Sequence, residues 1–205
     1  MNVSSSMVYV IDDDAELRES LCALMCSFGA AVTAFASAEE FLGGLSPMAR
    51  GVVVTDLRMP GMSGIELQQE LARRNSHLPI IILTAYARTS VTVQAIQGGA
   101  VTMLDKPYHD DELWQAIRIA QQREQTAWLA RQRRQEIEGR ISSLSAEERQ
   151  VAELVVQGMP NKNIASTLDI GIRTVEKRRR AILAKLKIDS VAALVELFVA
   201  VRDTK

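Results

Sequence analysis

The sequence lacks long hydrophobic runs, a basic leader and frequent helix breakers. No apolar stretch in its 205 residues reaches the roughly 18–20 residues that a membrane-spanning helix needs. Met1–Ser6 is polar and has no basic segment, so we expect no secretory signal and a cytosolic protein without a membrane partner. With 11 Gly, 5 Pro, 47% hydrophobic and 24% charged residues, the composition argues against a disordered chain and predicts globular domains.

Cysteine is also scarce, with Cys22 and Cys26 as the two present. Two thiols without accompanying histidines make a poor zinc site. The two residues lie four apart within a helical pattern and therefore share one helix face. We expect both to be buried, free thiols.

The net charge of −1 conceals an uneven distribution along the chain. Residues 1–123 hold 9 basic and 14 acidic residues, a net charge of −5, whereas residues 124–205 hold 15 and 11, a net charge of +4. An acidic half joined to a basic half indicates two separate roles. The basic half is a candidate for binding a phosphate backbone.

The first half alternates short β-branched runs with amphipathic stretches. Four of five runs are almost wholly apolar, as strands buried on both faces should be, while the second is more polar. Five strands that alternate with helices predict an α/β fold with a five-stranded, parallel, doubly wound, flavodoxin-like sheet. The predicted strands are Val8–Ile11, Ala31–Phe35, Val52–Asp56, Ile80–Thr84 and Val101–Leu104.

A long helix is expected to leave this domain. It begins near Asp111, and Trp114, Ile117 and Ala120 can pack on the sheet before the sequence becomes polar. We therefore predict a first domain over residues 1–123, a linker helix over 124–140 and a second domain over 141–205.

The second domain is predicted to be all helical, with four helices. Ser145-x-x-Glu148 reads as a capping box at the start of the first helix, which Gly158 and Pro160 end. A turn at Gly171 separates the next two helices. These later helices are expected over Asn161–Leu168, Thr174–Lys187 and Ser190–Val201.

Three acidic residues stand at predicted strand ends in the first domain. Asp12 and Asp13 follow the first strand and Asp56 ends the third, so a parallel sheet brings them to one edge. Clustered carboxylates favour a cation, and Mg²⁺ binds through one or two carboxylates plus water and phosphate oxygens. The cluster predicts a phosphoryl-transfer site in which Asp56 is the nucleophile.

Two residues at other strand ends complete this predicted site. Thr84 ends the fourth strand, where its hydroxyl can bond a phosphoryl oxygen. Lys106 follows the fifth strand and supplies a compact positive charge. A cis bond between Lys106 and Pro107 would aim the lysine into the site.

Four segments, YVIDDDAELR, VVVTDLRMPGMSGIEL, IIILTAYA and GGAVTMLDKPYHDDEL, resemble the signature segments of a response-regulator receiver domain over about residues 7–123. The resemblance implies that Asp56 accepts a phosphoryl group from a histidine kinase and that Thr84 and Lys106 hold its oxygens. It further implies that Asp13, Asp56 and the Arg58 backbone carbonyl bind Mg²⁺, with Asp12 acting through water.

One residue departs from the receiver pattern. Receivers usually carry Tyr or Phe three residues before the lysine, where this chain has Met103. In the usual switch the equivalent of Thr84 moves toward the phosphate and the ring turns inward behind it. A flexible thioether can fill the same gap, whereas Tyr86 and Tyr108 do not occupy the position.

The segment LSAEERQVAELVVQGMPNKNIASTLDIGIRTVEKRRRAILAKLKIDS resembles the LuxR-type helix-turn-helix of the NarL/FixJ class. The resemblance makes the helix from Thr174 the recognition helix, with Glu176, Lys177 and Arg180 facing bases. It gives as phosphate contacts Lys162, Asn163, Thr174, Arg178 and Lys185. It gives as core residues Ile164, Ala165, Leu168, Val175 and Ile182.

The family resemblance also implies partners. Phosphorylation would favour a homodimer, through the final helix at about Ser190–Val199 and through receiver segments Thr89–Gln97 and Val101–Leu104. Such a dimer would bind two DNA half-sites, with RNA polymerase as a further partner.

Two other functions compete with transcriptional regulation. A phosphatase using Asp56 as nucleophile would need a second acid two residues on, and Arg58 occupies that position. A protein-binding adaptor with a helical domain that reads no DNA is the second alternative. The basic recognition helix argues against the adaptor.

Overall fold

The computed structural model describes residues 7–85 and 89–202, except for the side chain of Arg202. Two parts of the chain that the sequence analysis named, Met1–Ser6 and Tyr86, lie outside the described residues. The chain divides into two compact units, Met1–Trp128 and Leu129–Lys205. Each unit has its own hydrophobic core. Among the described residues, no helix combines the length and apolarity that crossing a membrane requires.

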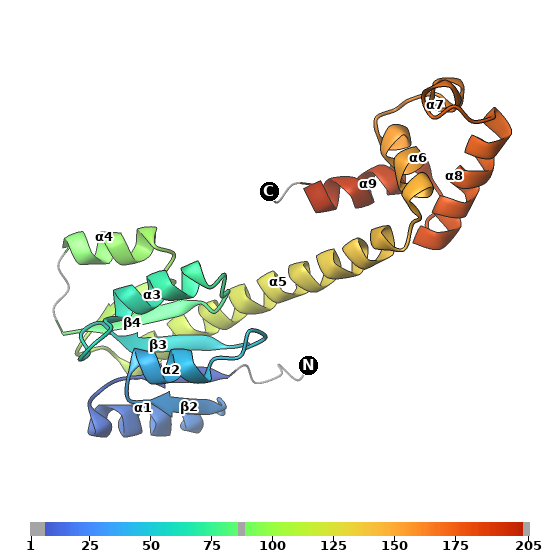
Figure 1. The fold of residues 1–205 in the computed structure, drawn as a ribbon. Helices are drawn as coiled ribbons and strands as arrows, with labels where there is room; N and C mark the ends of the chain where they lie inside the picture. Colours follow the sequence, from blue (N-terminus) through green and yellow to red (C-terminus); the bar gives the residue numbers. More distant parts are fainter. Residues whose placement is uncertain (1–6, 86–88, 203–205) are drawn as a thin grey trace. The chain divides into compact units, whose positions relative to one another are not determined.

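The first unit is built on a five-stranded parallel sheet with the order β2-β1-β3-β4-β5 (Figure 1). The strands are β1 (Val8–Ile11), β2 (Val32–Phe35), β3 (Val52–Asp56), β4 (Ile80–Thr84) and β5 (Thr102–Asp105). The predicted α/β class and parallel sheet are confirmed, and strand bounds differ from prediction by at most one residue. β2 lies at an edge and is half exposed, which explains its more polar sequence.

Helices cover both faces of the sheet. They are α1 (Ala15–Ser27), α2 (Ala38–Gly44), α3 (Gly64–Arg73), α4 (Thr89–Gln97) and the first part of α5 (Asp110–Ser142). One core cluster joins α2, α3 and α4 to side chains such as Ile82, and the other joins α1 and α5 to side chains such as Ile81. Successive strand residues point to opposite faces, so Ile81 and Ile82 serve different layers.

Side-chain caps fix where the helices begin after the strands. Asp14 caps α1 by accepting from the N–H groups of Glu16 and Leu17. Ser63 and Glu66 form a capping box at α3, so both loops that follow β1 and β3 end at a defined residue.

The prediction that both cysteines are buried is wrong. Cys22 is half-buried against the α1–α5 core layer, whereas Cys26 is exposed. Leu21 and Met25 occupy the inward face of α1 in their place. A four-residue spacing aligned the two thiols correctly but did not specify which face turns to the sheet.

Arg50 and Glu124 form a charged clamp that attaches α5 to the first unit. Arg50 donates from Nε and Nη2 to the two carboxylate oxygens of Glu124, at 2.8 and 2.9 Å. The Glu124 side chain is only 2% exposed, and the Arg50 guanidinium lies 4.0 Å from the ring centroid of Trp128. The hydrogen bonds to Glu124 raise the pKa of Arg50. The helix then continues past Gly139 to Ser142.

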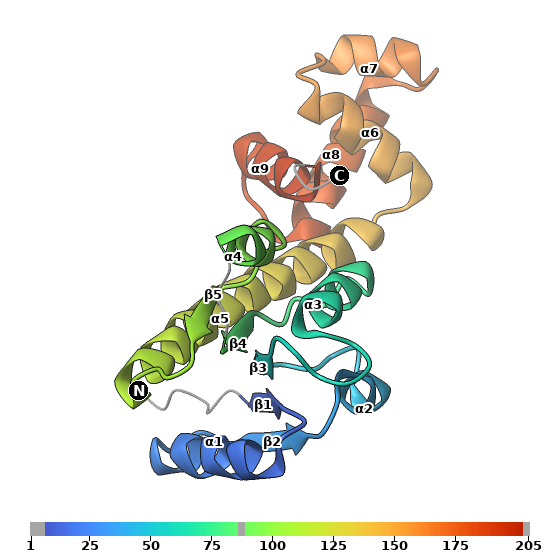
Figure 2. The same cartoon turned by 90° about the vertical axis from the view of Figure 1, so that its left-hand side faces the viewer.

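The second unit is all helical, as predicted, and comprises the C-terminal part of α5 with α6 (Ala146–Val156), α7 (Asn161–Thr167), α8 (Ile172–Leu186) and α9 (Val191–Arg202), seen in Figure 2. The predicted capping box at Ser145 and Glu148 is present. Ile164, Val175 and Ile182 are at most 1% exposed, which confirms them as core residues. Ala165 is buried as well, and Leu168 packs partly buried against the same cluster.

Candidate functional site

The carboxyl edge of the sheet brings three of the predicted side chains into contact. Lys106 Nζ donates to Asp56 Oδ1 at 2.6 Å and to Asp12 Oδ2 at 3.3 Å. The three residues follow or end β5, β3 and β1, strands that are separated in sequence but adjacent or nearly adjacent in the sheet. The Lys106–Pro107 peptide bond is cis, as expected.

Asp56 is held from both sides. Its Oδ1 accepts from Lys106, and its Oδ2 accepts from the Arg58 backbone N–H at 2.6 Å. The Asp56 side chain stays 14% exposed, so one carboxylate is fixed in direction yet reachable from solvent. That combination suits a group that must attack an incoming molecule.

Asp12 is the buried member of the group, at 2% exposure. Burial raises the pKa of Asp12, and the Asp56 charge adds to that rise, against opposing effects from the Asp14 N–H and Lys106. Burial alone would lower the pKa of Lys106, but its bonds and charge interactions with Asp56 and Asp12 outweigh burial and raise it. The ammonium is therefore the cation that offsets two neighbouring carboxylates.

The remaining predicted residues of this site lie on the same edge of the sheet. Thr84 ends β4 and is buried, and Asp13 is exposed in the loop after β1. No set of three His, Cys, Asp or Glu side chains in residues 7–85 and 89–202 has the arrangement of a metal site. Two carboxylates with oxygen ligands nearby still fit Mg²⁺, which retains several waters.

Met103 lies in β5 opposite Ile82 and is half-buried against the core layer of α2, α3 and α4. The Thr92 hydroxyl of α4 donates to the Met103 sulfur at 3.5 Å. The position that departs from the receiver pattern therefore contacts the helix next to it. The sequence did not predict this contact.

The second unit exposes most of the residues predicted to bind DNA. Among these predicted contacts on α7 and α8, Arg178 is half-buried, and the exposed ones are Lys162, Asn163, Thr174, Glu176, Lys177, Arg180 and Lys185. Lys185 Nζ is engaged by Glu148 Oε2 of the capping box at 2.6 Å. Hydrogen bonds from Lys185 and from the Ser145 N–H lower the pKa of Glu148. The sequence prediction did not anticipate that this lysine has an internal partner.

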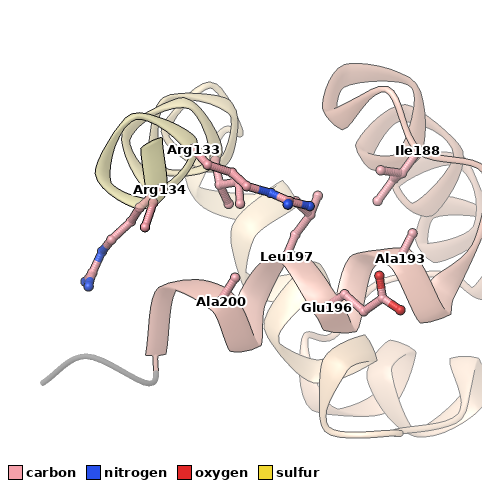
Figure 3. A pocket seen from close by; sticks show the side chains of 9 residues that line it. Arg133, Arg134, Ile188, Ala193, Glu196, Leu197 and Ala200 are labelled. Carbon is pink, nitrogen blue, oxygen red and sulfur yellow. The ribbon is translucent and has the colours of Figure 1, made fainter. Parts of the chain in front are cut away.

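A hollow lies between the C-terminal part of α5 and α9 (Figure 3). Arg133 reaches toward Leu197 across it, while Arg134 points away. Arg134 donates to the Val201 carbonyl at 3.3 Å and pairs with Glu138 at 2.8 Å. The side of α9 that faces the C-terminal part of α5 is therefore only partly covered by that helix.

Comparison with known proteins decides the family. Residues 8–118 match the response regulator receiver domain, and residues 142–198 match the family of bacterial regulatory proteins called the luxR family. The chain is a response regulator of the FixJ family. It is a transcriptional regulator with a receiver and a DNA-binding helix-turn-helix domain, and not a conventional enzyme.

Relatives share this organisation over nearly their whole length. The transcriptional regulatory protein FixJ of Azorhizobium caulinodans is 42% identical over 190 residues, covering 93% of this chain and 90% of the relative. The response regulator protein TmoT of Ectopseudomonas mendocina is 36% identical over 209 residues, covering 100% and 93%. A low-resolution structure of the response regulator StyR matches with a TM-score of 0.84 and 39% identity, covering 94% of this chain and 98% of StyR.

Proposed function

We propose that Asp56 is the phosphoacceptor through which a histidine kinase controls this regulator. The supporting observation is that one ammonium, Lys106, contacts the carboxylates of both Asp56 and Asp12. An Asp56 oxygen attacks the phosphorus of a phosphohistidine, the P–N bond breaks, and its electron pair stays with the imidazole nitrogen. Lys106 then holds a phosphoryl oxygen in place of the Asp56 oxygen.

The other residues of the edge have positioning roles in this proposal. The Thr84 hydroxyl donates to a second phosphoryl oxygen, and the Arg58 N–H holds the other Asp56 oxygen during attack. Asp12, Asp13, Asp56 and the Arg58 carbonyl would hold Mg²⁺, which neutralises charge on the transferred group when bound.

Met103 and Thr84 form the proposed switch. Movement of the Thr84 hydroxyl toward the phosphoryl group opens space beside β5, into which the flexible Met103 side chain can move. Because Met103 contacts Thr92, that movement reaches α4. The altered α4–β5 surface then favours a homodimer.

Dimerisation joins two helix-turn-helix domains on DNA. Exposed apolar surface on α9 supports dimerisation through this helix, since Val199 is 43% exposed and Ala200 borders the open hollow. A dimer through α9 contacts two half-sites, with α8 in the major groove of each. Glu176, Lys177 and Arg180 face bases, whereas Lys162, Asn163, Thr174, Arg178 and Lys185 contact phosphates. Bound dimers would recruit or exclude RNA polymerase.

A small-molecule phosphodonor tests the proposal directly. The wild-type protein, incubated with Mg²⁺ and acetyl phosphate, is expected to gain the mass of one phosphoryl group, and Asp56→Asn to gain none. A DNA fragment is first selected from random sequence by its binding to the wild type. Treatment with the phosphodonor should then tighten the binding of the wild type to this fragment and leave the binding of Asp56→Asn unchanged. A folded wild-type sample that gains no mass would exclude the proposed acceptor.

The adaptor alternative is separated by the salt dependence of DNA binding. Contacts to phosphates make log affinity fall with log salt by about 0.9 per phosphate neutralised. A flat response would favour a protein partner over DNA.

A further inference from the structure

The four adjacent basic residues of α8, Lys177–Arg180, differ in their exposure and in their partners. Val175, Ile182 and Leu186 are at most 1% exposed and mark the inward face. Arg178 and Arg179 both lie within helical reach of Val175 and Ile182, and both are half-buried at the border of that inward face. Their neighbour Arg180 is exposed. The sequence predicted DNA contacts for Lys177, Arg178 and Arg180 and assigned no role to Arg179.

The Arg179 side chain has internal partners along its length. It lines a small cavity with core residues that include Val155, Ile182 and Leu194. Its Nη1 donates to Oδ1 of Asn161, the first residue of α7. The stem therefore packs at the edge of the core, and the guanidinium reaches the neighbouring helix.

Helix α7 depends on such contacts for its orientation. It has seven residues, and its N-cap residue Pro160 supplies no side-chain hydrogen bond. A helix this short is marginal by itself, so tertiary contacts must hold it. Lys162 and Asn163 of α7 directly follow Asn161, the residue to which Arg179 donates its hydrogen bond.

We propose that Arg179 is a positioning residue for DNA recognition and does not contact DNA. Its bond to Asn161 fixes the start of α7 against α8. The phosphate contacts on α7 and the base contacts on α8 then meet one DNA duplex at the same time. This inference rests on the proposed function in which α8 reads DNA.

Salt titration of DNA binding separates a positioning residue from a phosphate contact. The full-length Arg179→Met variant keeps an aliphatic stem and loses the bond. It should bind the selected DNA roughly tenfold more weakly, as expected for loss of a hydrogen bond from a charged group, with the wild-type salt slope. The matched variant Arg178→Met removes the same charge one residue away and should lower the slope by about 0.9.

The Asn161→Ala variant tests the partner independently. It should weaken binding as Arg179→Met does, and the double variant should bind no more weakly than either single one. Hydrogen exchange of the α7 amides should rise in Arg179→Met and stay at the wild-type level in Arg178→Met.

Several results would overturn the inference. A salt slope lowered in Arg179→Met as in Arg178→Met would make Arg179 a DNA contact, and unchanged affinity would remove its role. Should Arg179→Met fail to fold, Asn161→Ala must still show the loss of affinity at constant slope. A wild type that selects no DNA would refute the proposed function, while the exchange data would still report on the contact.

Discussion

Lys106 does not share its ammonium equally between its two carboxylates. The contact to Asp56 is 0.7 Å shorter than the one to Asp12, at 2.6 against 3.3 Å. Asp12 is also the more buried, and burial raises its pKa. Asp12, which has the longer contact to Lys106, therefore carries the larger desolvation penalty. Such a cost is typical of a site that gathers charged groups for function at the expense of stability.

Replacing Asp12 by asparagine should stabilise the protein at neutral pH in the absence of Mg²⁺. A raised folded-state pKa means that the wild type loses stability as pH rises through that pKa, because the buried group must ionise. The substituted amide has no charge to bury, and its oxygen can still accept from the Asp14 N–H. The melting temperature of Asp12→Asn should exceed that of the wild type at pH 7. The difference should shrink as pH falls toward the ordinary value of 3.8. A lower melting temperature at pH 7 would contradict this account.

The start of α3 packs directly against the backbone of Asp56. Gly64, the first residue of α3, lies so close that an added Cβ would stand 2.5 Å from the Asp56 carbonyl oxygen and 3.1 Å from Thr55 Cγ2. Both neighbours belong to β3 at the centre of the sheet, so neither can move without disturbing the site.

Gly64→Ala is therefore expected to destabilise the receiver by about 1–3 kcal/mol, the usual range for overpacking, and to slow phosphorylation by acetyl phosphate. Gly43→Ala is the control, since a Cβ on that helical glycine meets nothing within 4 Å. The control should be neutral or more stable by about 0.5–1 kcal/mol. Equal phosphorylation rates in the two variants would count against the close packing at Gly64.

The Arg50–Glu124 clamp in the middle of α5 gives a second prediction at this scale. Arg50→Met leaves Glu124 buried without its partner, which should destabilise the receiver by about 3 kcal/mol and increase hydrogen exchange around residues 121–128. Arg73→Met removes an arginine that is 75% exposed and should change stability by less than about 1 kcal/mol. The double variant Arg50→Met/Glu124→Met should recover most of the loss. Exchange that stays at the wild-type level in Arg50→Met would show that the clamp does not hold α5.

In the whole molecule, the sequence predicts what periodicity and strand order determine. Apolar runs located β3 and β4 to the residue, and the parallel arrangement then required Asp56 and Lys106 to meet at one edge. Contacts between elements without such a pattern were not predictable. Arg50 and Glu124 are 74 residues apart, and nothing in the sequence pairs them. Cys26 was misplaced because spacing aligns residues but does not orient a helix.

Two linked DNA contacts impose a spacing requirement that can be measured on the intact regulator. Phosphorylated protein should bind paired half-sites more tightly than one half-site. Inserting about 5 base pairs between them should abolish the gain, and about 10 should restore much of it, because a full turn returns both grooves to one side. A gain that is independent of spacing would argue against a rigid two-fold arrangement on DNA.

The ion pair between Lys185 and Glu148 makes a DNA phosphate compete with an acid of the protein itself. Every binding event that recruits Lys185 must first detach it from a carboxylate 2.6 Å away. Glutamine can still cap α6 but carries no charge, so Glu148→Gln should bind any duplex a few-fold more tightly and discriminate less between sequences. The affinities of the wild type and Glu148→Gln for random and for selected duplexes, measured at equal salt, would show whether this ion pair limits nonspecific DNA binding.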